Sequence, residues 1–174
     1  DFGVQTAVFM SPPKWHIGHV SWIYEAIISK IDKNYQFHSK ELSEYLNSYY
    51  QQFGAPHDKG LRGIISRPTI NEIFQYFNTI NQKVEKFIQT HELNEQEKKL
   101  IVTGFHHECQ HQELLVYDLQ HLLAEQYLPV RKNKISIQEN KEKEFVKIKG
   151  GIFEMGYNGN GFSYDIELPE HKTY

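Results

Sequence analysis

Apolar side chains recur at helical spacing along most of the chain. In the clearest stretch, Ile73, Ile80 and Phe87 stand seven residues apart, and other apolar residues lie three or four positions from each of them. An α-helix brings positions i, i+3, i+4 and i+7 to one face, so this pattern predicts an amphipathic helix. Thr69 is followed three residues later by Glu72, and this capping-box pattern predicts that the helix begins there.

Two further helices are predicted before this one. The first has Ser11 as its capping residue and Pro12 at its first helical position, and it continues to about residues 32–34. The second is shorter and covers roughly residues 39–52. The stretch 54–68, which contains glycine, proline and two arginines, predicts a loop.

A fourth helix is predicted to open at Asn94, which forms a second capping-box pattern with Glu97, and to end before Pro129. Three long amphipathic helices and one short helix predict an all-α domain with the architecture of a four-helix bundle. We assign residues 1–130 to this domain.

The character of the sequence changes after the bundle. Residues 131–144 are strongly charged and predict a linker. Residues 145–174 begin with alternating apolar and polar positions, which predict strands that turn at Gly150 and Gly151. A segment of about 30 residues cannot bury a core of its own. We therefore expect it to be the first part of a second, truncated domain.

Composition narrows the range of partners. The net charge is −3 and charged residues make up 24% of the chain, so neither nucleic acid nor an anionic membrane is an expected partner. No apolar run approaches the roughly 20 residues of a membrane span, and no basic segment precedes the short N-terminal apolar patch, as it would in a secretory signal. The single cysteine, Cys109, cannot form an internal disulfide, which favours a cytoplasmic location.

Histidine is frequent, with ten residues, and its positions predict a metal site. In the stretch 104–115, GFHHECQHQELL, His107 and His111 are four residues apart and share one helix face, about 5–6 Å apart at Cβ. The first predicted helix carries His16 and His19, and two facing bundle helices would bring His19 to the other pair. Three neutral imidazoles suit a catalytic metal with open positions, namely zinc, iron, nickel or copper by ligand type.

Other residues near these positions are assigned supporting or structural roles. Glu25 and Asp118 are candidates to orient the ligand rings through hydrogen bonds. Cys109 is expected to be a buried, inert thiol. Solvent exposure or helix capping is expected for the remaining histidines, which are His16, His38, His57, His91, His106, His121 and His171.

The segment from His107 to His111 also matches the H-E-x-x-H pattern of zinc proteases. In those enzymes the glutamate is the general base and a further metal ligand follows downstream. His121 and His171 do not match such an extended spacing, and the histidines of the first helix have no role in a protease. A protease is therefore disfavoured, and Glu108 is not expected to be a catalytic base.

Four sequence blocks, in this order, resemble one enzyme family. They are SPPKWHIGHVSWIYE, LNSYYQQFG, GLRGIISRPT and HHECQHQELLVYDLQHLL, and the tail FVKIKGGIFEMGYNGNGFSYDIELPEHKTY follows them. This arrangement, which covers nearly the whole chain, resembles the ergothioneine-type (EgtB-like) sulfoxide synthases. The resemblance implies a DinB-like four-helix bundle followed by the start of a formylglycine-generating-enzyme-like domain.

The resemblance also implies a chemistry. It implies a non-haem Fe(II) held by His19, His107 and His111, a site that zinc or nickel could occupy in purified protein. The implied reaction is O₂-dependent carbon–sulfur bond formation with S-oxygenation, which joins a cysteine-type thiol to the imidazole of a histidine derivative such as trimethylhistidine. Arg62 and Arg67, in the loop, are candidates to clamp a substrate carboxylate in bidentate fashion, with a surface position or a salt bridge as the structural alternative.

The chain also departs from the family pattern, and other functions stay open. Cys109, Lys149 and Ile166 stand where the family commonly has glutamine, proline and asparagine. The family's catalytic tyrosine lies in the second domain, so no catalytic residue is expected in this part. Ovothiol- or selenoneine-type relatives use other substrates. A DinB-like metal-dependent thiol transferase would need the bundle alone, which the tail argues against, and a non-enzymatic helical module would use its histidines structurally.

Overall fold

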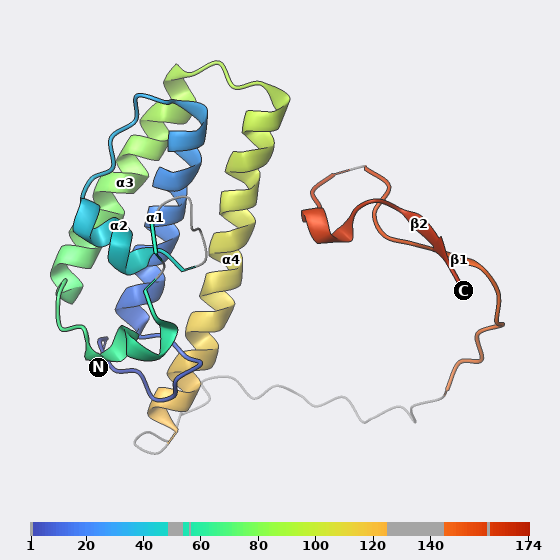
Figure 1. Cartoon of the computed structure of the whole chain (residues 1–174), viewed down its shortest axis with the longest axis horizontal. Coiled ribbons are helices and arrows are strands. Elements are labelled where there is room, and N and C mark those ends of the chain that lie inside the picture. Colours follow the sequence, from blue (N-terminus) through green and yellow to red (C-terminus); the bar gives the residue numbers. More distant parts are fainter. Residues whose placement is uncertain (1, 49–53, 56, 125–144, 160) are drawn as a thin grey trace, which may run out of the picture. The chain divides into compact units, whose positions relative to one another are not determined.

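The structure is a computed structural model, and it describes residues 2–48, 54–55, 57–124, 145–159 and 161–174 (Figure 1). The described chain is mostly helical, and none of its helices combines the length and the apolar character of a membrane span. The chain divides into two compact units, which are Asp1–Tyr127 and Leu128–Tyr174. The elements are α1 (Pro13–Ile31), α2 (Lys40–Leu46), the 3₁₀ helix η2 (Lys59–Ile64), α3 (Ile70–Thr90), α4 (Glu95–Leu123), β1 (Phe153–Met155), the 3₁₀ helix η3 (Asp165–Glu167) and β2 (His171–Thr173).

Helix α1 is the central element of the first unit. It lies between α3 and α4, and α2 also packs against it (Figure 1). Its side chains are buried on almost every side, including Trp15, Trp22 and Ile28. This burial of apolar and polar side chains alike places α1 inside the unit rather than at its surface. Leu46 of α2 and Ile80 of α3 complete this core, so the predominantly helical character predicted for this unit is confirmed.

Two glycines let neighbouring helices approach α1 closely. A Cβ atom on Gly104 of α4 would lie 2.8 Å from Ile27 Cδ1 of α1. A Cβ atom on Gly18 of α1 would lie 2.7 Å from Leu46 Cδ2 of α2. Both distances are shorter than van der Waals contact, so a larger side chain would push the helices apart. Gly104 stands one turn before His107, so the same close approach brings the histidines of α4 to α1.

The starts of α3 and α4 confirm the two capping-box predictions. The Thr69 side chain accepts a hydrogen bond from the Glu72 N–H, and the Glu72 carboxylate accepts one from the Thr69 N–H. Asn94 and Glu97 form the same reciprocal pair at the start of α4. Each pair satisfies backbone donors that the first helical turn leaves without a partner.

The predicted cap of α1 is wrong. Pro12 occupies the capping position without a side-chain hydrogen bond, and Pro13 is the first helical residue. Ser11 has partners in other elements instead. Its N–H donates to Asp118 Oδ2 at 3.0 Å, and its Oγ accepts from Arg62 at 2.8 Å. Ser11 therefore does not cap α1, because Asp118 and Arg62 engage its backbone N–H and its hydroxyl.

Helix α2 is shorter than predicted and ends at Leu46, and its expected continuation falls largely in residues 49–53, outside the described chain. Side chains of α1 satisfy the carbonyls at this end. His19 Nδ1 donates to the Leu46 carbonyl at 2.6 Å, and Trp15 Nε1 donates to the carbonyl one residue earlier at 3.1 Å. These bonds replace those of a further helical turn. The predicted end of α4 near Pro129 likewise lies outside the described residues.

The second unit contains a two-stranded antiparallel sheet in which Glu154 of β1 faces Lys172 of β2. Opposite charges at directly facing positions stabilise such a pair. The predicted turn at Gly150 and Gly151 is wrong, because β1 pairs with β2 and the residues before the glycines form no strand. The predicted linker, 131–144, lies outside the described residues.

Lys14 of α1 holds the loop that precedes α3. Its side chain is only 3% exposed. Its Nζ donates to the backbone carbonyls of Ile65 at 2.8 Å, Ser66 at 3.1 Å and Pro68 at 3.0 Å. One buried ammonium therefore satisfies three carbonyls of a single loop.

We expect Lys14→Met to lower the free energy of unfolding by about 2–3 kcal/mol, because three hydrogen bonds from a charged donor are lost. Urea unfolding followed by circular dichroism measures the change. Lys30→Met replaces an exposed lysine of the same helix and should stay within about 0.5 kcal/mol of wild type. Equal effects of the two substitutions would contradict the role assigned to Lys14.

Candidate metal centre

Three histidines converge at the contact between α1 and α4. His19 comes from α1, and His107 and His111 come from successive turns of α4. One ring nitrogen of each lies within 4.8 Å of one from each of the other two. The ring centroids are 5.2 Å apart for His19 and His107, 4.7 Å for His19 and His111, and 4.5 Å for His107 and His111. The structure thus brings together the three residues that the sequence predicts as ligands.

The ring of His19 has a defined orientation. It is 1% exposed and stacks on Trp15, with centroids 4.4 Å apart and 13° between the planes. A carbonyl oxygen can only accept, so the 2.6 Å contact with the Leu46 carbonyl places the proton on His19 Nδ1. The lone pair of the neutral ring is then on Nε2, where it is available to a metal.

A second histidine of α1 contacts the cluster. Nδ1 of His16 lies 2.9 Å from Nδ1 of His111, and Nε2 of His16 lies 2.9 Å from Oδ2 of Asp118. The expectation that His16 is exposed is wrong, because it is 4% exposed and faces α4. Its spacing of three residues from His19, which places both on one side of α1, is the sequence signal that could have indicated this contact.

His107 differs from the other two ligands. Its Nδ1 is buried and has no hydrogen-bond partner among the described residues. A buried polar atom without a partner is unfavourable unless a ligand, ion or water completes it. Three imidazoles, of which one keeps a buried nitrogen without a partner, fit a borderline divalent metal such as iron, zinc or nickel.

The environment keeps the three candidate ligands neutral. Burial lowers the pKa of His107 to about 4. Burial, followed by the neighbouring His107, lowers the pKa of His111 to about 3. Burial is the main reason that the pKa of His19 lies well below its usual value, and the neighbouring His111 lowers it further. Neutral imidazole is the form that binds a metal, so no proton has to leave these rings at pH 7.

These shifts predict acid destabilisation of the metal-free protein. The folded-state pKa values of His107 and His111 lie below the unfolded value of 6.5, so the unfolded chain binds more protons as the pH falls. Stability should decrease from about pH 6.5 down to about pH 4. The slope is at most about 1.4 kcal/mol per pH unit for each ring and smaller where solvent reaches it. Urea unfolding in chelator at pH 7, 6 and 5 measures this, and stability that is constant or rises on acidification would contradict it.

An open pocket of about 370 Å³ adjoins the three histidines. Arg62 lines it, is 3% exposed, and has its Cζ 3.4 Å from the ring centroid of Trp15. Lys59 adds a second cation, and polar groups come from Gln110 and Tyr117 of α4. The arrangement can attract an anionic ligand next to a metal.

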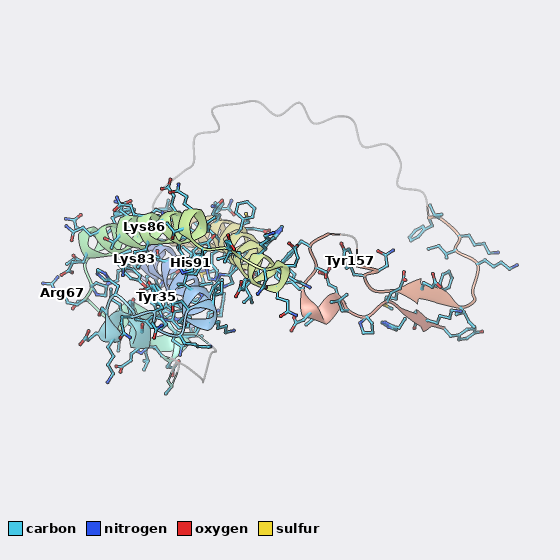
Figure 2. The ribbon with its side chains drawn as sticks, turned by 90° about the horizontal axis from the view of Figure 1, so that it is seen from above. Tyr35, Arg67, Lys83, Lys86, His91 and Tyr157 are labelled. Carbon is cyan, nitrogen blue, oxygen red and sulfur yellow. The ribbon has the colours of Figure 1, made fainter. Side chains whose placement is uncertain are left out.

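The structure separates the two arginines of the loop. Arg62 lies at the pocket, held by the hydrogen bond to Ser11. Arg67 is exposed, lies at the edge of the helical unit (Figure 2) and is absent from the pocket lining. Of the two candidates, Arg62 therefore lies beside the three histidines, among the described residues that line the pocket.

Three residues near the site differ in their surroundings from the candidate ligands. Glu25 does not orient a ligand, because its carboxylate accepts from Tyr35, from Tyr76 and from a backbone N–H. Cys109 is exposed, so the expectation of a buried thiol is wrong. Glu108 accepts a hydrogen bond from Tyr24 at 3.3 Å and does not line the pocket beside the three histidines.

No protein-family model matches this chain, and a search of curated proteins found no significant match.

Proposed function

We propose that His19, His107 and His111 bind one divalent metal ion, and that the protein is the N-terminal part of an ergothioneine-type, iron-dependent sulfoxide synthase with a DinB-like bundle. The observation that carries this proposal is the convergence of three imidazole ligand atoms within 4.8 Å beside an open pocket. Support also comes from the sequence blocks, because four separate blocks contribute to the same pocket. Their lining residues include Trp15, Ser48, Arg62 and the two α4 histidines.

The proposed reaction balances without an external reductant. A thiol S–H bond and an imidazole C–H bond break, and a carbon–sulfur bond forms. One oxygen atom of O₂ stays on sulfur as the sulfoxide, and the other leaves as water with the two hydrogens. O₂ accepts all four electrons. Iron(II), when bound, would supply O₂ activation and a binding position for the thiol, for which three protein ligands leave room.

The protein's own residues would bind and orient the substrates. Three neutral imidazoles leave the full charge of a divalent ion in place, which favours an anionic thiolate. Arg62 is fixed on Trp15 and faces the pocket, so it can hold a carboxylate without first losing side-chain freedom. Lys59, which is exposed, would add a flexible second cation. We assign the substrate carboxylate to Arg62 and not to Arg67.

Two readouts test this proposal. In the first, Co(II)-loaded protein is titrated with cysteine, and a sulfur-to-cobalt charge-transfer band is expected with wild type but not with His111→Ala. In the second, Fe(II)-loaded protein receives cysteine and trimethylhistidine, with and without O₂, and mass spectrometry detects the sulfoxide. Product that requires O₂ and both substrates supports the proposal. Failure of the thiol to alter the cobalt spectrum would contradict it.

One observation favours a second function. The first unit by itself supplies the described residues that line the pocket, so a metal-dependent thiol transferase could work with the bundle alone. Such an enzyme would consume thiol and an electrophilic acceptor without O₂. Anaerobic thiol loss with Zn(II)-loaded protein and an electrophile distinguishes it from the synthase.

A further inference from the structure

We propose that His16 is a positioning residue for the ligand His111, and that Asp118 holds His16 in the tautomer that this requires. The inference rests on the proposed metal site. Its basis is a continuous chain of contacts, with 2.9 Å from Asp118 Oδ2 to His16 Nε2 and 2.9 Å from His16 Nδ1 to His111 Nδ1. The chain runs from a carboxylate of α4, across α1, and back to α4.

The hydrogen-bond partners determine where each proton lies. The backbone N–H of Ser11 donates to Asp118 Oδ2 at 3.0 Å, so this oxygen is an acceptor. Nε2 of His16 contacts the same oxygen and therefore donates its proton to it. A neutral imidazole with a proton on Nε2 has its lone pair on Nδ1. His111 must then donate from its own Nδ1, which leaves the lone pair of His111 on Nε2 for a metal.

Burial makes this arrangement stiff. His16 is 4% exposed and Asp118 is 8% exposed, so water has little access to the bonds that join them. Both ring nitrogens of His16 are engaged, which makes it unsuited to act as a fourth ligand. Partners of this kind orient metal-bound histidines and raise their basicity.

The three ligands are consequently supported in different ways. His19 is fixed by the Leu46 carbonyl, and His111 is fixed by the chain through His16. His107 has no orienting hydrogen bond of this kind among the described residues. The binding energy of the site should therefore depend on His16, although His16 does not touch the metal.

Two substitutions at one position test the inference. His16→Leu removes the acceptor for the His111 Nδ1 proton. His16→Asn keeps an acceptor, because its amide oxygen stands at nearly the position of the imidazole Nδ1. We expect the Co(II) dissociation constant to rise about 10- to 100-fold in His16→Leu and to stay within a factor of about three in His16→Asn, by the same acceptor requirement. His121→Ala, on the same face of α4, is the matched control and should bind as wild type.

A spectroscopic readout separates positioning from packing. In ¹⁵N-histidine spectra of metal-free wild type, His111 should carry its proton on Nδ1. In the Co(II) form, the shifted Nδ1–H signal of His111 should persist in wild type and His16→Asn and exchange away in His16→Leu, while that of His19 persists in all three. If His16 only filled space, His16→Leu should bind Co(II) more tightly than His16→Asn, because leucine is the more apolar side chain.

The possible outcomes are distinct. If the spectrum of metal-free wild type shows the His111 proton on Nε2, the inference is overturned, whether or not the protein binds metal. Equal cobalt affinity in wild type and His16→Leu would also overturn it while leaving the metal site in place. Wild type that binds no cobalt would contradict the proposed function, and the metal-free spectrum would still decide the role of His16. Because that spectrum uses wild type, a failure of His16→Leu to fold leaves the test intact.

Discussion

Replacing either His19 or His111 by alanine is expected to weaken metal binding by about a thousandfold, or about 4 kcal/mol, because each change removes one of three protein ligands. The two residues lie on different helices, so the equal loss is a signature of a site shared between α1 and α4. Isothermal titration with Zn(II) or Co(II) measures the affinity. The titrations belong in a Cys109→Ser background, since the exposed thiol of Cys109 can itself bind these metals.

His106→Ala and His121→Ala provide controls on α4 outside the cluster, and both should bind as wild type. If His111→Ala loses affinity while His19→Ala retains it in full, the site is not shared between the two helices. This result would move the third ligand elsewhere and reopen the protease alternative.

Substitution of Glu25 is expected to give the largest loss of stability. Its carboxylate is 0% exposed and accepts hydrogen bonds from the hydroxyl of Tyr35 at 2.7 Å, from the backbone N–H of His38 at 2.8 Å and from the hydroxyl of Tyr76. Burial, followed by Glu25 itself, raises the pKa of Tyr76, so its hydroxyl stays a donor. Glu25 therefore joins α1 to α3 and to the connection before α2.

We expect Glu25→Ala to lower the free energy of unfolding by about 4 kcal/mol, because three buried donors lose their acceptor and a cavity forms. Tyr76→Phe, which removes one donor, should cost about 1–2 kcal/mol. Urea unfolding of the metal-free proteins gives both values. A smaller loss for Glu25→Ala than for Tyr76→Phe would contradict this network. Glu25→Gln should retain wild-type metal affinity, since Glu25 contacts no ligand.

The features that were predicted correctly from the sequence are those that depend on interactions between residues close together in the chain. The capping boxes at Thr69 and Asn94 set the starts of α3 and α4, because both partners of each pair lie within three residues. The spacing of His107 and His111 on one helix face is equally local. These features depend on helical geometry and need no knowledge of the neighbouring elements.

The errors arise where tertiary contacts override the local pattern. Ser11 does not cap α1 because Arg62 and Asp118 bind it. Helix α2 ends early because His19 and another α1 side chain donate to its last carbonyls. His16 is buried because its partners, 95 and 102 residues away, lie on another helix. The spacing of His16 and His19 indicates a shared face of α1, but it does not identify partners that lie so far away in the sequence. These long-range pairs are also contacts that shape the metal centre.

X-ray absorption of the Zn(II)-loaded protein tests the central claim most directly, because the fine structure reports the ligand atoms around the metal. We predict a first shell of nitrogen and oxygen at about 2.0–2.1 Å, with outer-shell scattering from three imidazoles, to match His19, His107 and His111. Removal of His19 should reduce the imidazole count by one. A sulfur shell at about 2.3 Å, or a spectrum with fewer than two imidazoles, would contradict the three-histidine site.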